Sequence, residues 1–189
     1  MADYTTVKNA GANFNVVKYT GNASGQSITG VGFQPDLLWI KSRSAGYNWA
    51  VRDVQRGPTV NLRINSTNAD QTQSDSVTSF DSDGFTLGAD SSSFVNENSA
   101  TYCSWSWKAG GAASSNGDGT ITSQVSVNTT AGISVITYSG NGTGNSTIGH
   151  GLGATPDFII IKRRDSTGNW GTKNPAYNSA AESFNCTFT

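Results

Sequence analysis

The sequence contains the same block twice, and this repeat constrains the fold more than any other feature. Residues 30–43 read GVGFQPDLLWIKSR, and residues 149–164 read GHGLGATPDFIIIKRR. The flanks repeat as well, because Tyr19 returns 119 residues later as Tyr138 and Trp49 returns 121 residues later as Trp170. Such self-similarity indicates a tandem of one structural unit. We expect a module of about 120 residues followed by a shorter copy of it.

Composition divides the chain into four parts. We predict an N-terminal arm over residues 1–13, a first module over 14–108, a Gly/Ala/Ser-rich linker over 109–119, and a linking strand with the start of a second, truncated copy over 120–189. The second copy has no counterpart of residues 80–108. Because half a module buries too little surface to close its own core, we expect further chain or a partner chain to complete it.

Short apolar segments alternate with turn signals along the whole chain. The run at 36–41 has the length of a strand covered on both faces, and its β-branched counterpart at 158–161 favours a strand over a helix. The Asp83-Gly84 pair predicts a hairpin, and the Gly-x-Gly turn at Gly30 predicts a tight corner with positive φ. The predicted fold is therefore all-β, with tandem antiparallel β-sandwich (jelly-roll-like) modules of which the second is incomplete.

Residues 100–108 form the clearest amphipathic strand. Trp105 and Trp107 share one face, whereas Tyr102, Ser104 and Ser106 share the other. A tryptophan side chain covers ~150–250 Å² of surface. We therefore expect the tryptophan face to point into the core.

Charge and cysteine content exclude several classes of protein. The net charge is −1 and 13% of residues are charged, so the chain offers no basic field to nucleic acid or to an anionic membrane. The first residues show neither a basic start nor an apolar run, so we expect no signal peptide, and no apolar run reaches the ~20 residues of a membrane helix. Cys103 and Cys186 occupy non-equivalent places in the two copies, and we expect both to be buried free thiols.

Residues for catalysis or metal binding are sparse. His150 is the only histidine, which excludes a histidine-based triad or a multi-histidine zinc site within one chain. It is expected either as a turn residue facing solvent or a neighbour, or as a metal ligand shared by three copies on a three-fold axis. Glu97 and Glu182 are the only glutamates and do not form an equivalent pair, so no glycosidase site is expected. We predict no enzyme activity, no cofactor and no metal site.

Aromatic side chains could stack on sugar rings if they are exposed. The four candidates are Tyr19, Tyr47, Trp49 and Tyr102. Tyr19 and Trp49 recur in the second copy, which favours a role in the module's own packing. The remaining possible contacts for a ligand or partner are Tyr47, Tyr102 and His150.

The order of three motifs resembles a known family. The segments YTGNASGQSITGVGFQPDLLWIKSR, SFDSDGFTLG and YCSWSWKAGG are similar to an uncharacterised module of phage virion proteins, which recurs in tandem in tail-fibre-like proteins of marine and cyanobacterial phages. The resemblance covers nearly all of residues 14–189. It implies a structural or adhesive role in the virion, with no reaction attached.

The resemblance also implies partners and a location. The N-terminal part would attach to other virion proteins of the tail or baseplate, the protein would form a homotrimer, and outer modules would contact a glycan on the host surface. Assembly would take place in the host cytoplasm. Two alternatives stay open: a capsid decoration protein on the phage head, or a carbohydrate-binding module with an aromatic platform on one exposed face.

Overall fold

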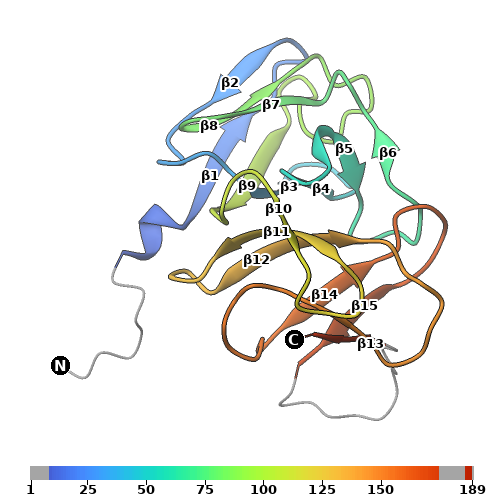
Figure 1. The fold of residues 1–189 in the computed structure, drawn as a ribbon. Helices are drawn as coiled ribbons and strands as arrows, with labels where there is room; N and C mark the ends of the chain where they lie inside the picture. Colours follow the sequence, from blue (N-terminus) through green and yellow to red (C-terminus); the bar gives the residue numbers. More distant parts are fainter. Residues whose placement is uncertain (1–8, 175–185, 189) are drawn as a thin grey trace.

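The computed structural model describes residues 9–174 and 186–188, which fold into two β lobes (Figure 1). The predicted all-β fold with antiparallel sheets is confirmed, because 43% of the described residues lie in strands and 2% in helix. A 3₁₀ turn, η1 (Ala10–Ala12), precedes the first strand. The first lobe contains β1 (Phe14–Thr20), β2 (Gln26–Ile28), β3 (Leu37–Ser42), β4 (Ala50–Asp53), β5 (Gly57–Leu62), β6 (Gln71–Thr72), β7 (Val77–Asp81), β8 (Gly84–Leu87) and β9 (Thr101–Trp107).

The second lobe contains shorter sheets. Its strands are β10 (Ser114–Asn116), β11 (Ser123–Asn128), β12 (Ile133–Tyr138), β13 (Ser146–Ile148), β14 (Ile159–Lys162), β15 (Trp170–Lys173) and β16 (Cys186–Phe188). They pair as a three-stranded sheet β10-β11-β12, an antiparallel pair β14-β15 and a parallel pair β13-β16.

The first lobe is a sandwich of two sheets. One sheet has the order β1-β9-β3-β4-β5-β6 and the other the order β2-β8-β7. The core between them includes Leu38 and Ile40 of β3 and Phe85 and Leu87 of β8, all fully or almost fully buried. The apolar run predicted at 36–41 therefore forms a central strand, and its alternate residues supply the core.

The sequence-based prediction for β9 was wrong about its faces. Tyr102, Ser104 and Ser106 are fully buried, whereas Trp105 and Trp107 are only half-buried on the outer face. The core-facing side of β9 therefore consists of Tyr102 and two small serine side chains. The Ser104 hydroxyl donates a hydrogen bond to the carbonyl oxygen of residue 17 (3.2 Å), so it is not buried without a partner.

The predicted Gly-x-Gly corner and Asp-Gly hairpin are both confirmed, and they meet. Gly30 and Gly32 have φ values of 87° and 86°, and Asp81 pairs with Gly84 across the β7–β8 hairpin. The Asp83 carboxylate accepts hydrogen bonds from the backbone N–H of Gly30 (3.0 Å) and of Gly32 (2.5 Å). These bonds lower the pKa of Asp83, and they give the Asp-Gly motif a structural role.

The second lobe reproduces part of the first in the same register. Ile159 pairs with Lys173, 121 residues after Leu38 and Arg52, which pair in the β3–β4 ladder. The repeated block therefore corresponds to the same arrangement of strands, with β12, β13, β14 and β15 taking the places of β1, β2, β3 and β4.

Residues 109–119, predicted as a linker, are packed against the second lobe. Residues 114–116 form β10, which pairs with β11, and Gly110 N–H donates to the Ser126 hydroxyl (3.0 Å). A Cβ atom on Gly110 would lie 2.5 Å from the Val127 carbonyl oxygen. Small residues suit both a flexible linker and a close backbone approach, and composition alone does not distinguish the two.

The predicted N-terminal arm and the two cysteines are only partly covered by the described residues. Residues 1–8 of the predicted N-terminal arm lie outside the described residues, and Asn13 is held by a bond from Lys108 N–H to its carbonyl oxygen (2.8 Å). Cys103 is a half-buried free thiol on the outer face of β9. The side chains of Cys186 and Glu182 lie outside the described part of the chain.

Candidate functional site

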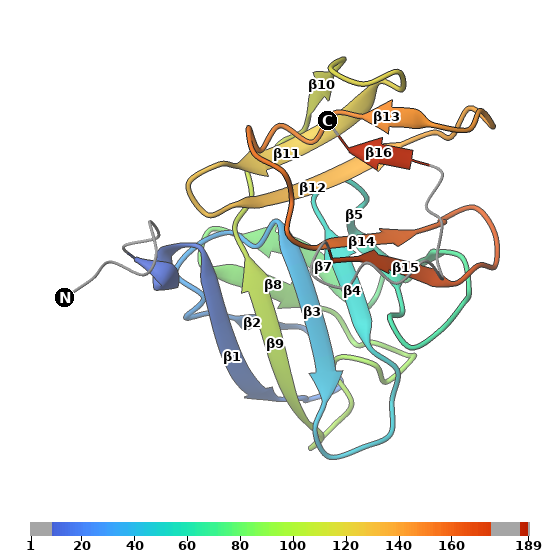
Figure 2. The same cartoon turned by 90° about the horizontal axis from the view of Figure 1, so that it is seen from below.

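The outer face of the six-stranded sheet carries a cluster of large aromatic side chains, which we call the aromatic face. It is formed by Phe14, Trp39, Trp49, Trp105 and Trp107. Strand register brings them together: Trp107 of β9 lies opposite Phe14 of β1, and Trp105 lies opposite Trp39 of β3. Figure 2 shows these strands side by side, with β2, β7 and β8 behind them and the second lobe at one end.

The rings of the aromatic face contact one another in a continuous row. The centroids of Phe14 and Trp107 are 5.1 Å apart, those of Trp107 and Trp39 are 5.4 Å apart, and those of Trp105 and Trp49 are 5.4 Å apart. Trp39 and Trp49 meet edge to face at 6.3 Å. Interlocked rings of this kind hold one another in place. The row is therefore a rigid apolar surface.

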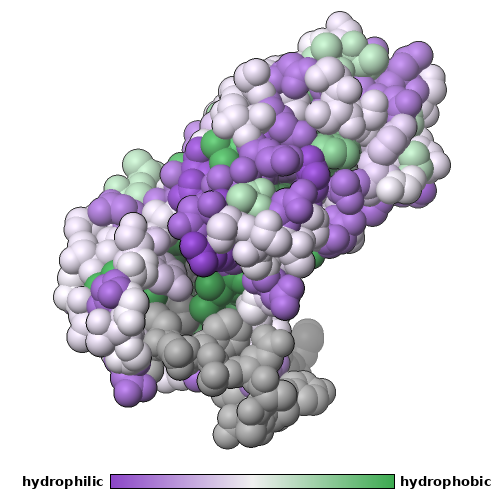
Figure 3. All heavy atoms as spheres, turned by 90° about the vertical axis from the view of Figure 1, so that its right-hand side faces the viewer, coloured by the Kyte–Doolittle hydropathy of each residue, from purple (hydrophilic) through white to green (hydrophobic). Residues whose placement is uncertain are grey.

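This surface is open at one side. Phe14 and Val16 of β1 are 38% and 41% exposed, and the four tryptophans are half-buried. An exposed apolar side chain occurring singly needs no explanation, but a contiguous row of aromatics on one sheet face is typical of a contact surface. The face shown in Figure 3 is different: it is mostly polar, and its apolar residues form separate small patches.

Polar groups border the aromatic face along the same strands. Lys18 of β1 and Lys41 of β3 both lie opposite Cys103 of β9. The Lys41 ammonium donates to the Tyr47 carbonyl oxygen (2.8 Å), which ties the loop after β3 to this border. Burial raises the pKa of the Cys103 thiol, so it stays in the thiol form at neutral pH.

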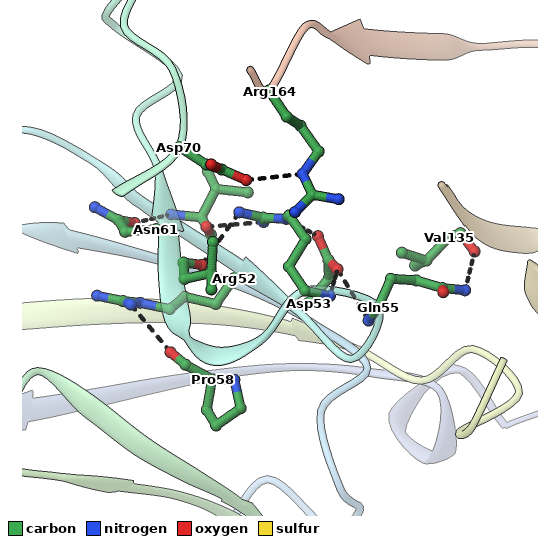
Figure 4. Close-up of polar contacts among 11 residues, drawn as sticks. Arg52, Asp53, Gln55, Pro58, Asn61, Asp70, Val135 and Arg164 are labelled. Atoms are coloured by element: carbon green, nitrogen blue, oxygen red, sulfur yellow. Dashed lines mark hydrogen bonds and ion pairs between the residues drawn. The ribbon is translucent and has the colours of Figure 1, made fainter. Parts of the chain in front are cut away.

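The two lobes contact each other through the β4–β5 turn and the loop after β5. The Gln55 amide donates to the carbonyl oxygens of Val135 (3.0 Å) and of Gln124 (3.3 Å) in the second lobe (Figure 4). Arg164 forms an ion pair with Asp70 (2.8 Å), and the backbone N–H of Asp70 donates to the Arg164 carbonyl oxygen (3.0 Å). These bonds fix the second lobe on the first.

A buried arginine supports this turn from inside the first lobe. The Arg52 side chain is fully buried, and it donates to the Pro58 carbonyl oxygen (3.0 Å), to Gln73 (2.9 Å) and to Ser76 (2.9 Å). Burial lowers the pKa of Arg52 to about 9, and the nearby Arg56 contributes to the shift. Arg56 in turn pairs with Asp53 (2.6 Å). Both arginines are used inside the fold, which leaves them unavailable to a ligand.

The three contact residues expected from the sequence do not form one site. Tyr47 is half-buried and its hydroxyl bonds to the Glu97 carboxylate. Tyr102 is fully buried, accepts a hydrogen bond from Glu97 N–H (3.0 Å) and donates one to the Ser93 carbonyl oxygen (3.2 Å), so its expected role as a contact residue is corrected to a core role. His150 is 6% exposed, and its Nδ1 accepts a bond from Leu152 N–H (3.1 Å).

The sequence does not predict the aromatic face, because alternation within one strand does not show which strands lie side by side. The pattern favours the core for Trp105 and Trp107, and the recurrence of Trp49 as Trp170 favours a role in the module's own packing. One signal was present: three separate segments predicted as strands or strand ends each carry a tryptophan at an alternating position. Among residues 9–174 and 186–188, no group of three His, Cys, Asp or Glu side chains could hold a metal ion. Within the same residues, no helix has the length and hydropathy to cross a membrane.

A comparison with family models finds one that matches residues 9–186 and is described as a domain of unknown function, DUF7483. The match covers both copies of the repeated block. Neither the curated proteins nor the solved structures contain a match for the chain.

Proposed function

We propose that this chain, which belongs to the DUF7483 family, is a non-enzymatic structural protein of a phage virion, of the tail-fibre or adhesin type, and that the aromatic face is its contact surface. The aromatic face is the observation that carries the contact role. The virion location rests on the resemblance of the motif order to modules of tail-fibre-like phage proteins.

Two properties of the molecule support an adhesive role. The lobes are joined by hydrogen bonds from several elements, so repeated units extend as a fixed body and not as beads on a flexible linker. Three copies of the chain would present three aromatic faces, and repetition of a weak contact surface raises overall avidity without a tighter individual site. In this proposal the N-terminal part attaches to tail or baseplate proteins, and three copies assemble into a homotrimer whose outer modules contact a host glycan.

The aromatic face also favours a second candidate, a carbohydrate-binding module. Rings presented on one face of a sheet can stack on the apolar faces of sugar rings while polar groups at the border bond to their hydroxyls. Capsid decoration is a third candidate, and it differs from the tail-fibre role only in where the protein lies on the particle.

Two measurements separate these candidates. Cryo-electron microscopy or immunogold labelling of the assembled phage would locate the protein. A few copies at the tail would support the tail-fibre role, hundreds on the head would support decoration, and absence from the particle would leave the free carbohydrate-binding module.

A glycan array with the full chain would test the aromatic face itself. We expect Phe14→Ser combined with Val16→Lys to weaken glycan binding at least tenfold, because both side chains are exposed and their loss leaves the core unchanged. Phe158→Ser, at an apolar position in the second lobe that is more exposed than Phe14 and Val16, is the control and should bind normally. Equal binding by all three proteins would remove the aromatic face from the proposal.

A further inference from the structure

Three basic side chains gather at one end of the outer face of the six-stranded sheet. Lys18 of β1 and Lys41 of β3 both lie opposite Cys103 of β9, so the three side chains share one face. Arg43 lies two residues beyond Lys41 and therefore points to the same side. Its backbone N–H donates to the Thr101 carbonyl oxygen (2.7 Å), which continues the pairing with β9. We call Lys18, Lys41 and Arg43 the cationic patch.

The charges of the cationic patch lie close together and have no counter-ion. Burial raises the pKa of the Cys103 thiol, and Arg43 and Lys18 act in the opposite direction, which places both charges near the same sulfur atom. Lys18 and Arg43 are exposed, and the Lys41 ammonium uses two of its three donors on backbone carbonyl oxygens (2.8 and 3.2 Å). Among residues 9–174 and 186–188, no carboxylate forms an ion pair with any of the three.

The strands that carry the patch contribute no negative charge. No Asp or Glu occurs in β1, β3 or β9. Glu97 accepts a hydrogen bond from the Tyr47 hydroxyl, and Asp53, at the other end of the same face, is paired with Arg56 (2.6 Å). The patch is therefore a local positive surface on a chain whose net charge is −1.

The cationic patch is continuous with the aromatic face. Val16 precedes Lys18 by two residues on β1, and Trp39 precedes Lys41 by two residues on β3. Side chains two residues apart on one strand are separated by about 7 Å. Figure 2 shows that the ends of β1 and β3 point away from the second lobe, so the patch lies at the open end of the sheet.

A ligand that fits both surfaces combines a flat apolar face with a negative charge next to it. A uronic acid has this chemistry, because its pyranose ring can stack on an aromatic side chain and its carboxylate is attached directly to that ring. The Arg43 guanidinium can bind a carboxylate through two parallel hydrogen bonds. An acidic peptide carries the charge without the flat ring. Nucleic acid fits less well, because three cations release few of the counterions on which its affinity depends.

We propose that the outer face of the first lobe binds acidic oligosaccharides built of uronic acids, with the sugar rings on the aromatic face and the carboxylates on the cationic patch. This inference rests on the proposed contact role of the aromatic face and adds the chemical class of the glycan. Lys18 and Arg43 pair with carboxylates of the bound chain, and the remaining donor of the Lys41 ammonium bonds to one of its oxygens.

Oligosaccharides of galacturonic, glucuronic and mannuronic acid, each compared with its methyl ester, provide the probes. The ester keeps the rings and hydroxyl groups and removes the charge. In titration calorimetry with the full chain, we expect at least one acid to bind about tenfold more tightly than its ester at low ionic strength, because at least two charge pairs contribute. High salt should reduce this preference.

The outcomes of this titration separate the inference from the proposed function. Equal binding of acid and ester would overturn the inference and leave the aromatic face as a contact surface for neutral glycans. Binding of a sulfated oligosaccharide without binding of any uronic acid would overturn the assignment to uronic acids. Binding of no glycan at all would overturn both the inference and the glycan-binding role.

Variants of the chain locate the binding surface. Lys18→Gln and Arg43→Gln should each weaken binding of the acid by about three- to fivefold, the range for one exposed ion pair, and leave binding of the ester unchanged. Lys173→Gln removes the same charge from an exposed position of β15 and is the matched control. Phe14→Ser combined with Val16→Ser should weaken binding of acid and ester alike. An equal loss in Lys173→Gln would overturn the assignment to the patch, and unchanged binding by the Phe14 and Val16 variant would count against the proposed function as well.

Discussion

Replacement of Tyr102 by phenylalanine tests the reassignment of this residue from the surface to the core. Phenylalanine retains the ring and its stacking on Tyr19, whose centroid is 5.1 Å away at an interplanar angle of 13°. It removes only the hydroxyl, which accepts from Glu97 N–H (3.0 Å) and donates to the Ser93 carbonyl oxygen (3.2 Å). The substitution therefore isolates two part-buried hydrogen bonds from the packing of the ring.

The expected loss follows from the groups left behind. A buried polar group that loses its partner costs about 1–3 kcal/mol, and Tyr102→Phe leaves two part-buried groups, the Glu97 N–H and the Ser93 carbonyl, without this partner. The longer bond to Ser93 is the weaker of the two, so we expect the free energy of unfolding to fall by about 2–4 kcal/mol. Tyr102→Ala would remove the ring as well, and it should cost more because it leaves a cavity in the core.

Urea unfolding followed by tryptophan fluorescence measures this loss. Tyr47→Phe is the matched control, since its hydroxyl bonds to Glu97 at a half-buried site and its removal should shift the midpoint less. An unchanged midpoint for Tyr102→Phe together with reduced glycan binding would refute the core assignment and return Tyr102 to the contact surface.

Three further predictions concern the second lobe, the corner and the lobe contact. Burial lowers the pKa of His150 below 6.5, so the unfolded chain takes up the proton at a higher pH than the folded chain. The free energy of unfolding should therefore fall as the pH drops below 6.5. Urea midpoints at pH 7.5 and pH 5 should show that His150→Val reduces this dependence. Gly84→Ala should destabilise the first lobe by at least about 2 kcal/mol in the same assay. The φ of Gly84 is 151°, and the new Cβ would lie 1.9 Å from the Ile28 carbonyl oxygen. An unchanged midpoint would contradict this. Arg164→Gln should cost less than about 1 kcal/mol, because its ion pair with Asp70 is exposed to solvent, and small-angle scattering should show the lobes still docked through their remaining bonds.

The repeat determined most of what could be read from the sequence. Two copies of one block, with β-branched residues in the second, predicted the strands β3 and β14 and their equivalence. Turn chemistry predicted the Gly30 corner and the β7–β8 hairpin, because positive φ and an Asp-Gly turn are local requirements that few residues satisfy. These features depend on the residue and its immediate neighbours, so tertiary structure had little to add.

The faces of β9 were decided only by the tertiary structure. Alternation shows that Tyr102 and Trp105 point in opposite directions, but it does not show which direction holds the second sheet. That sheet comes from residues 26–28 and 77–87, and the core between the two sheets lies on the side of Tyr102 and the serines. The tryptophans therefore lie outside and form the aromatic face. The placement of residues 109–119 depends in the same way on distant partners. Strand pairing joins segments that can lie far apart along the chain, and the sequence of one segment does not name its partner.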